Sequence, residues 1–577
     1  MKYIKQKQNY VTHPTVKVKG TTEKDVLVGY PKIVEQLVKD NGRIVVVDTY
    51  PAVRDSEVLP PLVEGLKPEI VIETIDLFYD EAEITKRMES HLTEDRVFGI
   101  IYYGNVIDFI DNDKLEVARK KVKEAKGKVL VYGFGAGLVT DKADTFIYAE
   151  LARWEIQQRY RSKEIGNYKC SNLEEDVLRK YKRAYFIEWR IADKHKRDMY
   201  DRFDYVLDTN KKDNPKMITN KVFCMGINQT VNGPFRVTPY FDPGVWGGQW
   251  MKEVFNLEEK PNYAWSFDGV PEENSLLLEI GNEVIELPSY DVVYLQSIKL
   301  LGEKVFARFG AEFPIRFDFL DTIEGQNLSL QVHPSREYVK KLCGMQYTQD
   351  ESYYILEAVE GATVYLGTKT GVNPDEMIQA LADGQKGVSF DAEKYINIYP
   401  AKKHDHFLIP AGTVHCSASG CMVLEISATP YIFTFKLWDW DRLGMDGLPR
   451  PIHLEHGKHN IRFDRDTEWT TKNLVNNLET IHDGEYHEEK TGLHELEFIE
   501  TRRFTTDKKV AIKTKESVNV LNLVEGTSAI VESPTNSFDP YTVHYAETFI
   551  IPEHVKEYTI RPENDETIKV LQAYVRV

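Results

Sequence analysis

The sequence lacks the features of a membrane-spanning or secreted protein. Its 577 residues contain no run of 18 or more apolar residues, the length that a transmembrane helix needs. The first residues, MKYIKQKQNY, carry no apolar core of signal-peptide length. Cysteine is sparse: five residues, at positions 170, 224, 343, 416 and 421, occur without CxxC spacing. These features predict free thiols in a reducing cytoplasm.

Basic residues are also fewer than acidic residues. There are 73 Lys and Arg residues against 91 Asp and Glu, which gives a formal net charge of -18 spread along the chain. Nucleic acids and anionic membranes both bind to basic faces, so we expect neither as a partner. A local basic pocket for one phosphate remains compatible with this balance. The length predicts about three to four domains, and the sequence does not indicate an oligomeric state.

Residues 25–230 alternate short apolar runs with charged stretches of helical pattern. The expected strands lie at 43–51, 69–78, 98–103, 128–137 and 144–151. Strands that alternate with helices predict an α/β domain with a parallel sheet.

From about residue 231 the pattern changes to short strands at close spacing, with frequent proline and glycine. This pattern predicts an antiparallel barrel or jelly roll over 231–455, interrupted by a helical insertion at 373–384. A further β-rich domain is expected over 456–577. Its phrase ETFIIPEHVKEYTI echoes DHFLIPAGTVHCSA at 405–418, but without a histidine at the corresponding position. We therefore expect a repeated β unit whose second copy is structural.

The phrase LSLQVHP at 328–334 carries the most specific chemistry. On a strand, residues i and i+2 face the same side, so Gln331 and His333 point together. Glu351 then begins the strand ESYYIL, and His415 ends the phrase PAGTVH. An amide oxygen, two imidazoles and a carboxylate would form a mixed nitrogen and oxygen site. Such a set suits zinc or another borderline divalent metal, and it leaves a position for substrate.

These motifs resemble class I mannose-6-phosphate isomerases. The phrases LSLQVHP, ESYYIL, IPAGTVH, LEIS and KLWDWDR carry the resemblance, which begins near GVWGGQWMKEVF at 244–255 and covers somewhat over half of the chain. The resemblance implies a double-cupin fold with one catalytic zinc. It also implies that Gln331, His333, Glu351 and His415 are the protein ligands. The expected activity is interconversion of mannose 6-phosphate and fructose 6-phosphate through an enediolate.

The resemblance also predicts substrate contacts, with two departures. Lys436 stands where the family has an arginine near the reacting carbons, and the segment from Glu425 to Lys436 looks one residue longer. Gln349 replaces a lysine that contacts phosphate, whereas the other phosphate contact, Ser329, is retained. Glu425 is a candidate acid/base or supporting carboxylate. Lysine keeps the charge of arginine but loses its planar fork, so these departures bear on which sugar is bound.

The N-terminal α/β segment resembles a nucleoside kinase with a P-loop fold. Arg153, Arg159 and Arg161 would form its basic lid over phosphates. However, the strand exit VVVDTYPAVRD at 45–55 lacks the lysine of a Walker A loop, and KVLVYGFGAGLV does not match a dinucleotide-binding motif. We interpret this domain as a degenerate, non-catalytic kinase-like module. A wholly structural α/β domain remains equally compatible with the sequence.

Three other functions compete with this hypothesis. The protein could isomerise a different sugar, bind a sugar phosphate as a regulator without turnover, or carry a working kinase half. The missing Walker lysine argues against a kinase, and the four ligand residues argue against a regulator without catalysis.

Overall fold

The structure, a computed structural model, describes residues 9–577 apart from 430–432, 446, 448–449 and 493. Its backbone contacts divide the chain into two compact units. The N-terminal unit comprises Thr15–Gln229 and Ser275–Leu295, and the β-rich unit comprises residues 9–14, Thr230–Asn274 and Gln296–Val577.

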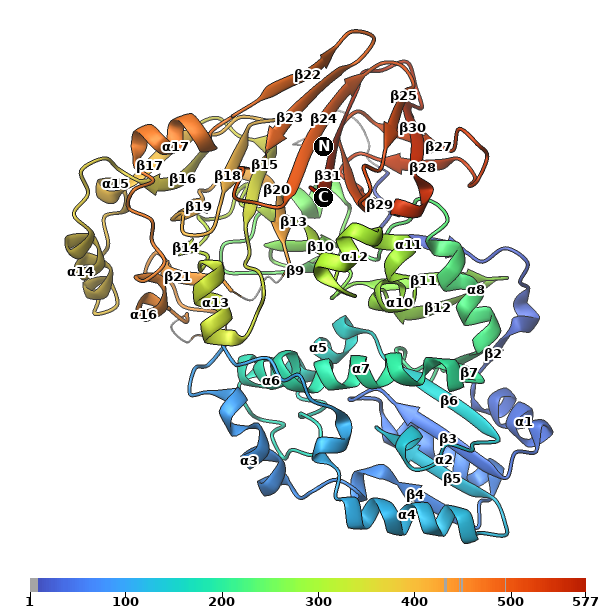
Figure 1. The fold of residues 1–577 in the computed structure, drawn as a ribbon. Coiled ribbons are helices and arrows are strands. Elements are labelled where there is room, and N and C mark those ends of the chain that lie inside the picture. The colour runs from blue at the N-terminus through green and yellow to red at the C-terminus, as the bar shows by residue number, and fades with distance from the viewer. Residues whose placement is uncertain (1–8, 430–432, 446, 448–449, 493) are drawn as a thin grey trace. The chain divides into compact units, whose positions relative to one another are not determined.

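The N-terminal unit is built on a seven-stranded sheet flanked by helices (Figure 1). Five neighbouring strands pair in parallel and two pair antiparallel at one edge. In spatial order the strands are β2 (Val26–Val28), β8 (Lys216–Thr219), β7 (Tyr205–Asp208), β6 (Thr145–Glu150), β3 (Ile44–Thr49), β5 (Val129–Gly133) and β4 (Ile70–Glu73). Every residue of β3, β5 and β6 is buried, as expected for inner strands covered on both faces. The resemblance to a nucleoside kinase stays a prediction.

One expected strand does not form. Residues 98–103 (FGIIYY) are irregular and pair with no strand of the described part of the chain. Their backbone instead bonds to helical segments: the N–H of Ile100 donates to the carbonyl of His91 at 2.7 Å, and that of Tyr102 to Phe186 at 2.9 Å. An apolar run of this length predicts burial, which Phe98 and Ile101 show, but it does not predict the partner of its backbone.

Residues 275–295 were expected within the jelly roll, but they cluster with the N-terminal unit. The strand β11 (Ser275–Ile280) pairs in parallel with β1 (Thr15–Lys17) and antiparallel with β12 (Glu283–Pro288). A partner from the start of the chain therefore determines where this hairpin lies.

The described residues of the β-rich unit form four antiparallel sheets. The first sheet has the order β18 (His406–Ile409), β15 (Glu351–Ala358), β20 (Cys421–Ala428), β13 (Ile315–Asp321), β10 (Trp265–Gly269) and β9 (Tyr240–Asp242). The second has the order β17 (Ile396–Pro400), β16 (Thr363–Thr368), β19 (His415–Ser417), β14 (Leu330–Val332) and β21 (Phe435–Trp438). The predicted helix over 373–384 is α14 (Pro374–Gly384), between β16 and β17.

The other two sheets follow in the last third of the chain. The third sheet has the order β22 (Glu479–Asp483), β23 (His487–Gly492), β24 (Ile499–Thr506), β31 (Ile568–Val575), β26 (Asn519–Glu525) and β29 (Thr548–Ile551). The fourth has the order β25 (Val510–Lys513), β30 (Glu557–Pro562), β27 (Ser528–Glu532) and β28 (Tyr541–His544). One apolar core, which includes Leu521, Phe549, Val531 and Tyr558, joins these two sheets face to face.

The two similar sequence phrases have similar local structures. The first phrase runs from β18, in the first sheet, through a turn to β19 in the second sheet. The other runs from β29, in the third sheet, through a turn to β30 in the fourth. Each phrase thus links one sheet to another by a short strand, a turn and a second strand.

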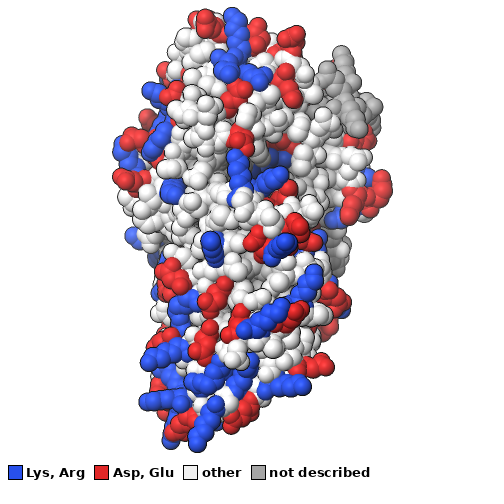
Figure 2. All heavy atoms as spheres, turned by 90° about the vertical axis from the view of Figure 1, so that its right-hand side faces the viewer, with Lys and Arg blue, Asp and Glu red and all other residues white. Residues whose placement is uncertain are grey.

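The surface and the thiols agree with the composition. On the face drawn in Figure 2, acidic and basic side chains are interspersed. All five cysteines are free. Among the described residues, no helix is both long enough and apolar enough to span a bilayer.

Candidate metal centre

The short strand β14 and its two neighbours, β19 and β21, place three polar side chains on one face of the second sheet. Gln331 lies opposite His415 of β19 on one side and opposite Lys436 of β21 on the other. Residues directly opposite each other on antiparallel strands project to the same face. Gln331, His415 and Lys436 therefore share a face, although they lie far apart in the sequence.

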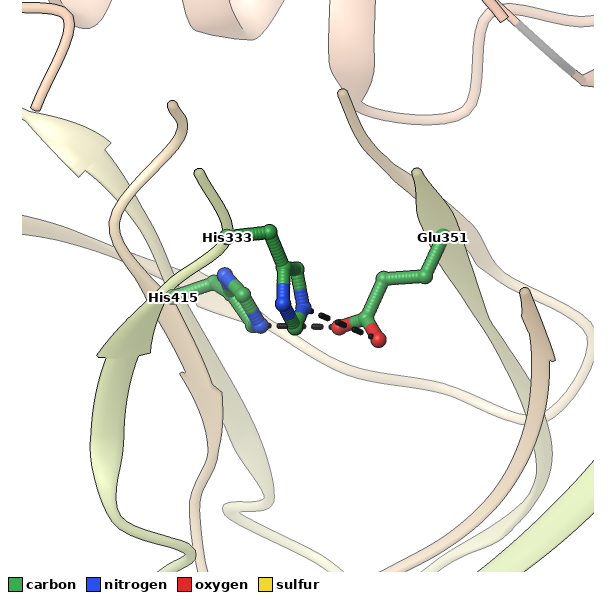
Figure 3. A group of neighbouring side chains, drawn as sticks. All are labelled: His333, Glu351 and His415. Carbon is green, nitrogen blue, oxygen red and sulfur yellow. Dashed lines mark ion pairs between the residues drawn. The ribbon is translucent and has the colours of Figure 1, made fainter. Parts of the chain in front are cut away.

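Three side chains from the first and second sheets converge: those of His333, Glu351 and His415 (Figure 3). Glu351 begins β15 in the first sheet, whereas His415 begins β19 and His333 directly follows β14 in the second. One ligand atom from each lies within 4.8 Å of those from the other two, and all three side chains are buried. Nε2 of His333 is 3.1 Å from Oε2 of Glu351, and Nε2 of His415 is 2.8 Å from Oε1. A fully buried carboxylate is stable as an anion only beside positive charge, which protonated imidazoles or a metal cation can supply.

The outer ring nitrogens favour a metal cation. Nδ1 of His415 lies 2.9 Å from the carbonyl oxygen of Thr413, and Nδ1 of His333 lies 3.3 Å from that of Phe433. A carbonyl oxygen only accepts, so each Nδ1 carries a hydrogen, and Nε2 is the ring nitrogen that faces inward. Within the described part of the chain, His333 Nε2 and Glu351 Oε1 have no hydrogen-bond partner. Two imidazole nitrogens and a carboxylate with these orientations fit a divalent metal.

The pKa of Glu351 depends on the same neighbours. Burial alone would raise the pKa of Glu351, but the adjacent rings of His333 and His415 hold it well below its usual range. Gln331 joins the group through its side-chain amide, whose Nε2 is 3.1 Å from Nε2 of His415. Amide oxygen and nitrogen exchange places by a half turn, so the amide oxygen can take the inward position.

Gln349 and Glu425 lie beside this group. Nε2 of Gln349 donates to Glu351 Oε2 at 3.1 Å and is 3.5 Å from Oε1 of Glu425. Burial, followed by the charges of Glu351 and Asp318, raises the pKa of Glu425 well above its usual range. The structure thus brings Glu425 close to the triad.

Two buried charged residues near the centre were missed from the sequence. Strand β20 lies between β13 and β15. Its Ser427 pairs with Arg316 of β13 and with Glu351 of β15, and its Glu425 pairs with Asp318 of β13. Arg316 and Asp318 form an ion pair, and burial raises the pKa of Asp318 to about 7 even though Arg316 opposes this. The signal was the alternation in IRFDF at 315–319, in which Arg316 and Asp318 occupy every second position. Such alternation normally indicates a solvated face.

Ser329 lies in a separate polar group, two residues before Gln331. Its hydroxyl donates to Asp439 at 2.6 Å and is 3.3 Å from Nη1 of Arg450. Asp439 also pairs with Arg450 at 3.0 Å and with Arg442 at 2.7 Å. Two guanidinium groups therefore lie near the hydroxyl that was predicted to contact phosphate.

Lys436 is half-buried on β21. Its position opposite Gln331 puts it on the face that carries the metal-ligand candidates. Residues 430–432, in the segment that looked one residue longer, are outside the described residues.

The predicted lid arginines of the N-terminal unit make internal contacts. Arg159 is buried and donates to Glu155 at 2.9 Å and to the carbonyl of Ala52 at 2.7 Å. Arg153 pairs with Asp193 at 3.0 Å and lies over the ring of Trp189. These two side chains stabilise the unit's own fold.

Comparisons with known proteins found one matching family and several relatives that cover part of the chain. Residues 29–232 match a family described as "Domain of unknown function (DUF8485)". The chain is 22% identical over 335 residues to a Bacillus subtilis protein named "Probable mannose-6-phosphate isomerase GmuF", covering 57% of this chain and 96% of that one. It is 27% identical over 214 residues to a mannose-6-phosphate isomerase of Streptococcus mutans, covering 37% of this chain and 62% of that one.

A solved structure, the mannose 6-phosphate isomerase of Bacillus subtilis, aligns with a TM-score of 0.49 at 18% identity. It covers 59% of this chain and 100% of that one. The share of this chain that these relatives cover thus ranges from 37% to 59%.

Proposed function

We propose that the β-rich unit is a metal-dependent aldose–ketose isomerase that interconverts mannose 6-phosphate and fructose 6-phosphate. The observation that carries this proposal is the convergence of His333, Glu351 and His415 around one centre. The names of the relatives support the choice of substrate. Gln331 would be the fourth protein ligand, and zinc is the first candidate metal because the ligands are nitrogen and oxygen donors.

Such an isomerase moves a proton between C1 and C2 of the open-chain sugar. A bound divalent ion would supply a Lewis acid that polarises the carbonyl group. Glu425 would gain and lose the proton, because its raised pKa lets this carboxyl group hold a proton more readily than an ordinary glutamate. Lys436, on the same face as Gln331, would stabilise negative charge that develops on the C1 and C2 oxygens.

The phosphate end of the substrate would bind near Ser329. Gln349 brings no charge to that task, but Arg442 and Arg450 surround the Ser329–Asp439 pair. Guanidinium groups bind phosphate in a bidentate manner, so these arginines can replace the cation that the family has at position 349. Binding energy from the phosphate would then hold the reacting carbons in position.

A coupled assay tests the proposal. The metal-replete full-length protein is given a panel of hexose 6-phosphates and, as a control, unphosphorylated mannose. We expect turnover of mannose 6-phosphate and fructose 6-phosphate, with a much lower kcat/KM for mannose. Turnover of another sugar would reassign the substrate. Binding of sugar phosphates without turnover by the metal-loaded protein would favour a regulatory protein.

For the N-terminal unit we propose a role without phosphoryl transfer. It lacks the Walker lysine, and Arg153 and Arg159 are engaged in internal contacts.

A further inference from the structure

The turn at Pro410–Thr413, which precedes the strand of His415, contacts the surroundings of all three buried ligand candidates. The carbonyl of Thr413 accepts from Nδ1 of His415 at 2.9 Å. The N–H of Gly412 donates to the carbonyl of His333 at 2.9 Å. The N–H of Ala411 donates to Oδ1 of Asp350, the neighbour of Glu351, at 2.7 Å. The position of this turn therefore bears on the orientation of each ligand.

A single distant side chain fixes the turn. Nη1 of Arg465 donates to the carbonyls of Pro410 at 2.7 Å and Ala411 at 2.8 Å, and to the hydroxyl of Thr413 at 2.6 Å. Thr413 in turn donates its hydroxyl hydrogen to Pro410 at 2.8 Å. Arg465 is 5% exposed, so water does not compete strongly for these bonds.

The backbone of Arg465 is itself held. Its carbonyl accepts from the hydroxyl of Thr470 at 3.0 Å, and Thr470 lies within α17 (Thr467–Leu474). Gly412 has a φ of +92°, and a Cβ there would lie 2.6 Å from the side chain of Arg462 and 2.9 Å from the carbonyl of Asn460. The segment 460–465 thus packs directly against the turn.

We propose that Arg465 is a positioning residue for the metal centre: it holds the Pro410–Thr413 turn so that His415 presents Nε2 to the metal. The proposal rests on the proposed metal site and extends it to a residue that contacts no ligand directly. Partners of metal-binding histidines set the tautomer and the ring direction, and their loss typically lowers metal affinity about 10–100-fold. Here the partner of His415 is the backbone carbonyl of Thr413. Arg465 therefore acts on His415 indirectly, through its hydrogen bonds to the turn that carries this carbonyl.

Arg465→Gln removes the charged fork, and Arg462→Gln is the matched control. The Arg462 side chain is 56% exposed and pairs with Asp464, and its contribution to the turn is a backbone N–H that the substitution leaves in place. Zinc affinity is measured on the full-length variants by competition with a chelator, in the absence of sugar. The Co²⁺ absorption spectrum, which reports ligand geometry, is recorded in parallel.

We expect Arg465→Gln to weaken zinc binding about 10-fold or more and to change the Co²⁺ spectrum, with Arg462→Gln unchanged. Arg465→Lys, which keeps the charge and some donors, should recover part of the affinity. Should Arg465→Gln fail to fold, Thr413→Val provides the second test, because it removes the hydroxyl that accepts from Arg465. We expect it to weaken zinc binding as well.

Affinity within about twofold of the parent in the folded Arg465→Gln or Thr413→Val variant would overturn the proposal. Equal losses in Arg465→Gln and Arg462→Gln would also overturn it, because the effect would then belong to the segment as a whole. A parent that binds zinc but turns over no sugar refutes the isomerase and leaves the positioning role intact. A parent that binds no zinc refutes both the metal site and this role.

Discussion

Two regions of this protein bury charged side chains at strand ends, in opposite ways. At the candidate metal centre, His333 Nε2 and Glu351 Oε1 are buried without a hydrogen-bond partner among the described residues, and they meet His415 around a common point. Burying polar groups in this way is costly unless something binds between them. This group of side chains is therefore compatible with a bound metal ion.

In the N-terminal unit, the corresponding groups bind one another. Asp48, at the end of β3, accepts the N–H groups of Gly135 at 3.0 Å and Gly137 at 2.8 Å, and it lies 2.7 Å from Nε2 of His195. One residue further along α7 (Trp189–Met199), Lys196 forms ion pairs with both Glu150 and Asp291. Lys196 and His195 thus lie beside these carboxylates, although both oxygens of Glu150 and Oδ2 of Asp291 have no hydrogen-bond partner among the described residues.

The contrast matters because the second region lies where a parallel sheet usually binds a ligand. After β3 the chain continues to β4, toward one edge of the sheet. After β6 it continues to β7, toward the opposite edge, so the connections diverge at the neighbouring strands β3 and β6. Open α/β sheets bind ligands at such a switch point, beyond the carboxyl ends of the strands. Both regions thus bury carboxylates beside nitrogen-bearing side chains, and they differ in those side chains: two histidine rings at the metal centre, and Lys196 with His195 in the N-terminal unit.

The largest effect that tests this comparison comes from the metal centre. The double substitution His333→Ala, His415→Ala removes two of the proposed ligands and should abolish stoichiometric metal binding. Loss of a Lewis acid worth several kcal/mol should lower turnover on the order of 10³-fold or more, since about 1.4 kcal/mol corresponds to a factor of ten. Metal content is measured by elemental analysis after dialysis, next to the parent. Full occupancy in the double variant would exclude this site.

The second effect tests the charged cluster of the N-terminal unit, which consists of Asp48, Glu150, His195, Lys196 and Asp291. Lys196→Met removes the cation that Glu150 and Asp291 share, and breaking a buried ion pair in this way typically costs about 3–5 kcal/mol. We expect faster hydrogen exchange in peptides that cover β3 and β6, with metal content and isomerase activity unchanged. Arg197→Met, on the exposed side of α7, is the control and should change stability by less than about 0.5 kcal/mol. Unchanged exchange in Lys196→Met would show that the cluster is not a stabilising element.

The two regions also differ in how far the sequence predicted them. Alternation within LSLQVHP placed Gln331 and His333 on the same side, and the structure brings His333 together with Glu351 and His415. That much follows from a local period of two and from a motif. The clustering of the N-terminal charges does not, because Asp48 and His195 are 147 residues apart and only the packing of α7 on the sheet joins them.

Features that depend on register or on a distant partner could not be predicted. Arg316 and Asp318 alternate with apolar residues as a solvated strand would, and only the pairing of β13 with β20 shows that they face the metal centre. Residues 98–103 have the composition of a strand, yet their backbone bonds to helical segments. Arg465 acts on a turn about 50 residues earlier in the chain, and no local period connects the two.

A smaller effect concerns Lys436, whose proposed role rests on its position opposite Gln331. Lys436→Ala should lower kcat on the order of 10²-fold, as does removal of one donor to a developing negative charge, with little change in KM. Metal content should not change, because Lys436 is not a ligand. Lys436→Arg should keep activity if the pocket accepts a guanidinium. If Lys436→Ala stays within about twofold of the parent, Lys436 does not contact the substrate, and the assignment to mannose 6-phosphate is weakened.

The smallest expected effect is that of ATP on the N-terminal unit. Binding raises stability only when the ligand prefers the folded state, and the cluster at the β3–β6 switch point has already paired its own charges. We therefore expect MgATP to leave hydrogen exchange in β3 and β6 unchanged. We also expect no phosphorylated nucleoside or sugar by mass spectrometry.

The full-length chain is the right material for that experiment. Residues 9–14 cluster with the β-rich unit, and Tyr10 stacks on Phe255 with ring centroids 4.0 Å apart. A truncated chain that begins near residue 231 would lose both the N-terminal unit and this contact within the β-rich unit. A change in activity could then not be assigned to either loss. The His333→Ala, His415→Ala variant is the better control, because it removes isomerase chemistry and leaves the N-terminal unit intact. If a phosphorylated product forms at equal rates in the parent and in this variant, but is lost in Lys196→Met, the N-terminal unit is a working kinase. Both regions would then be binding sites, and they would differ only in the kind of ligand that each one binds.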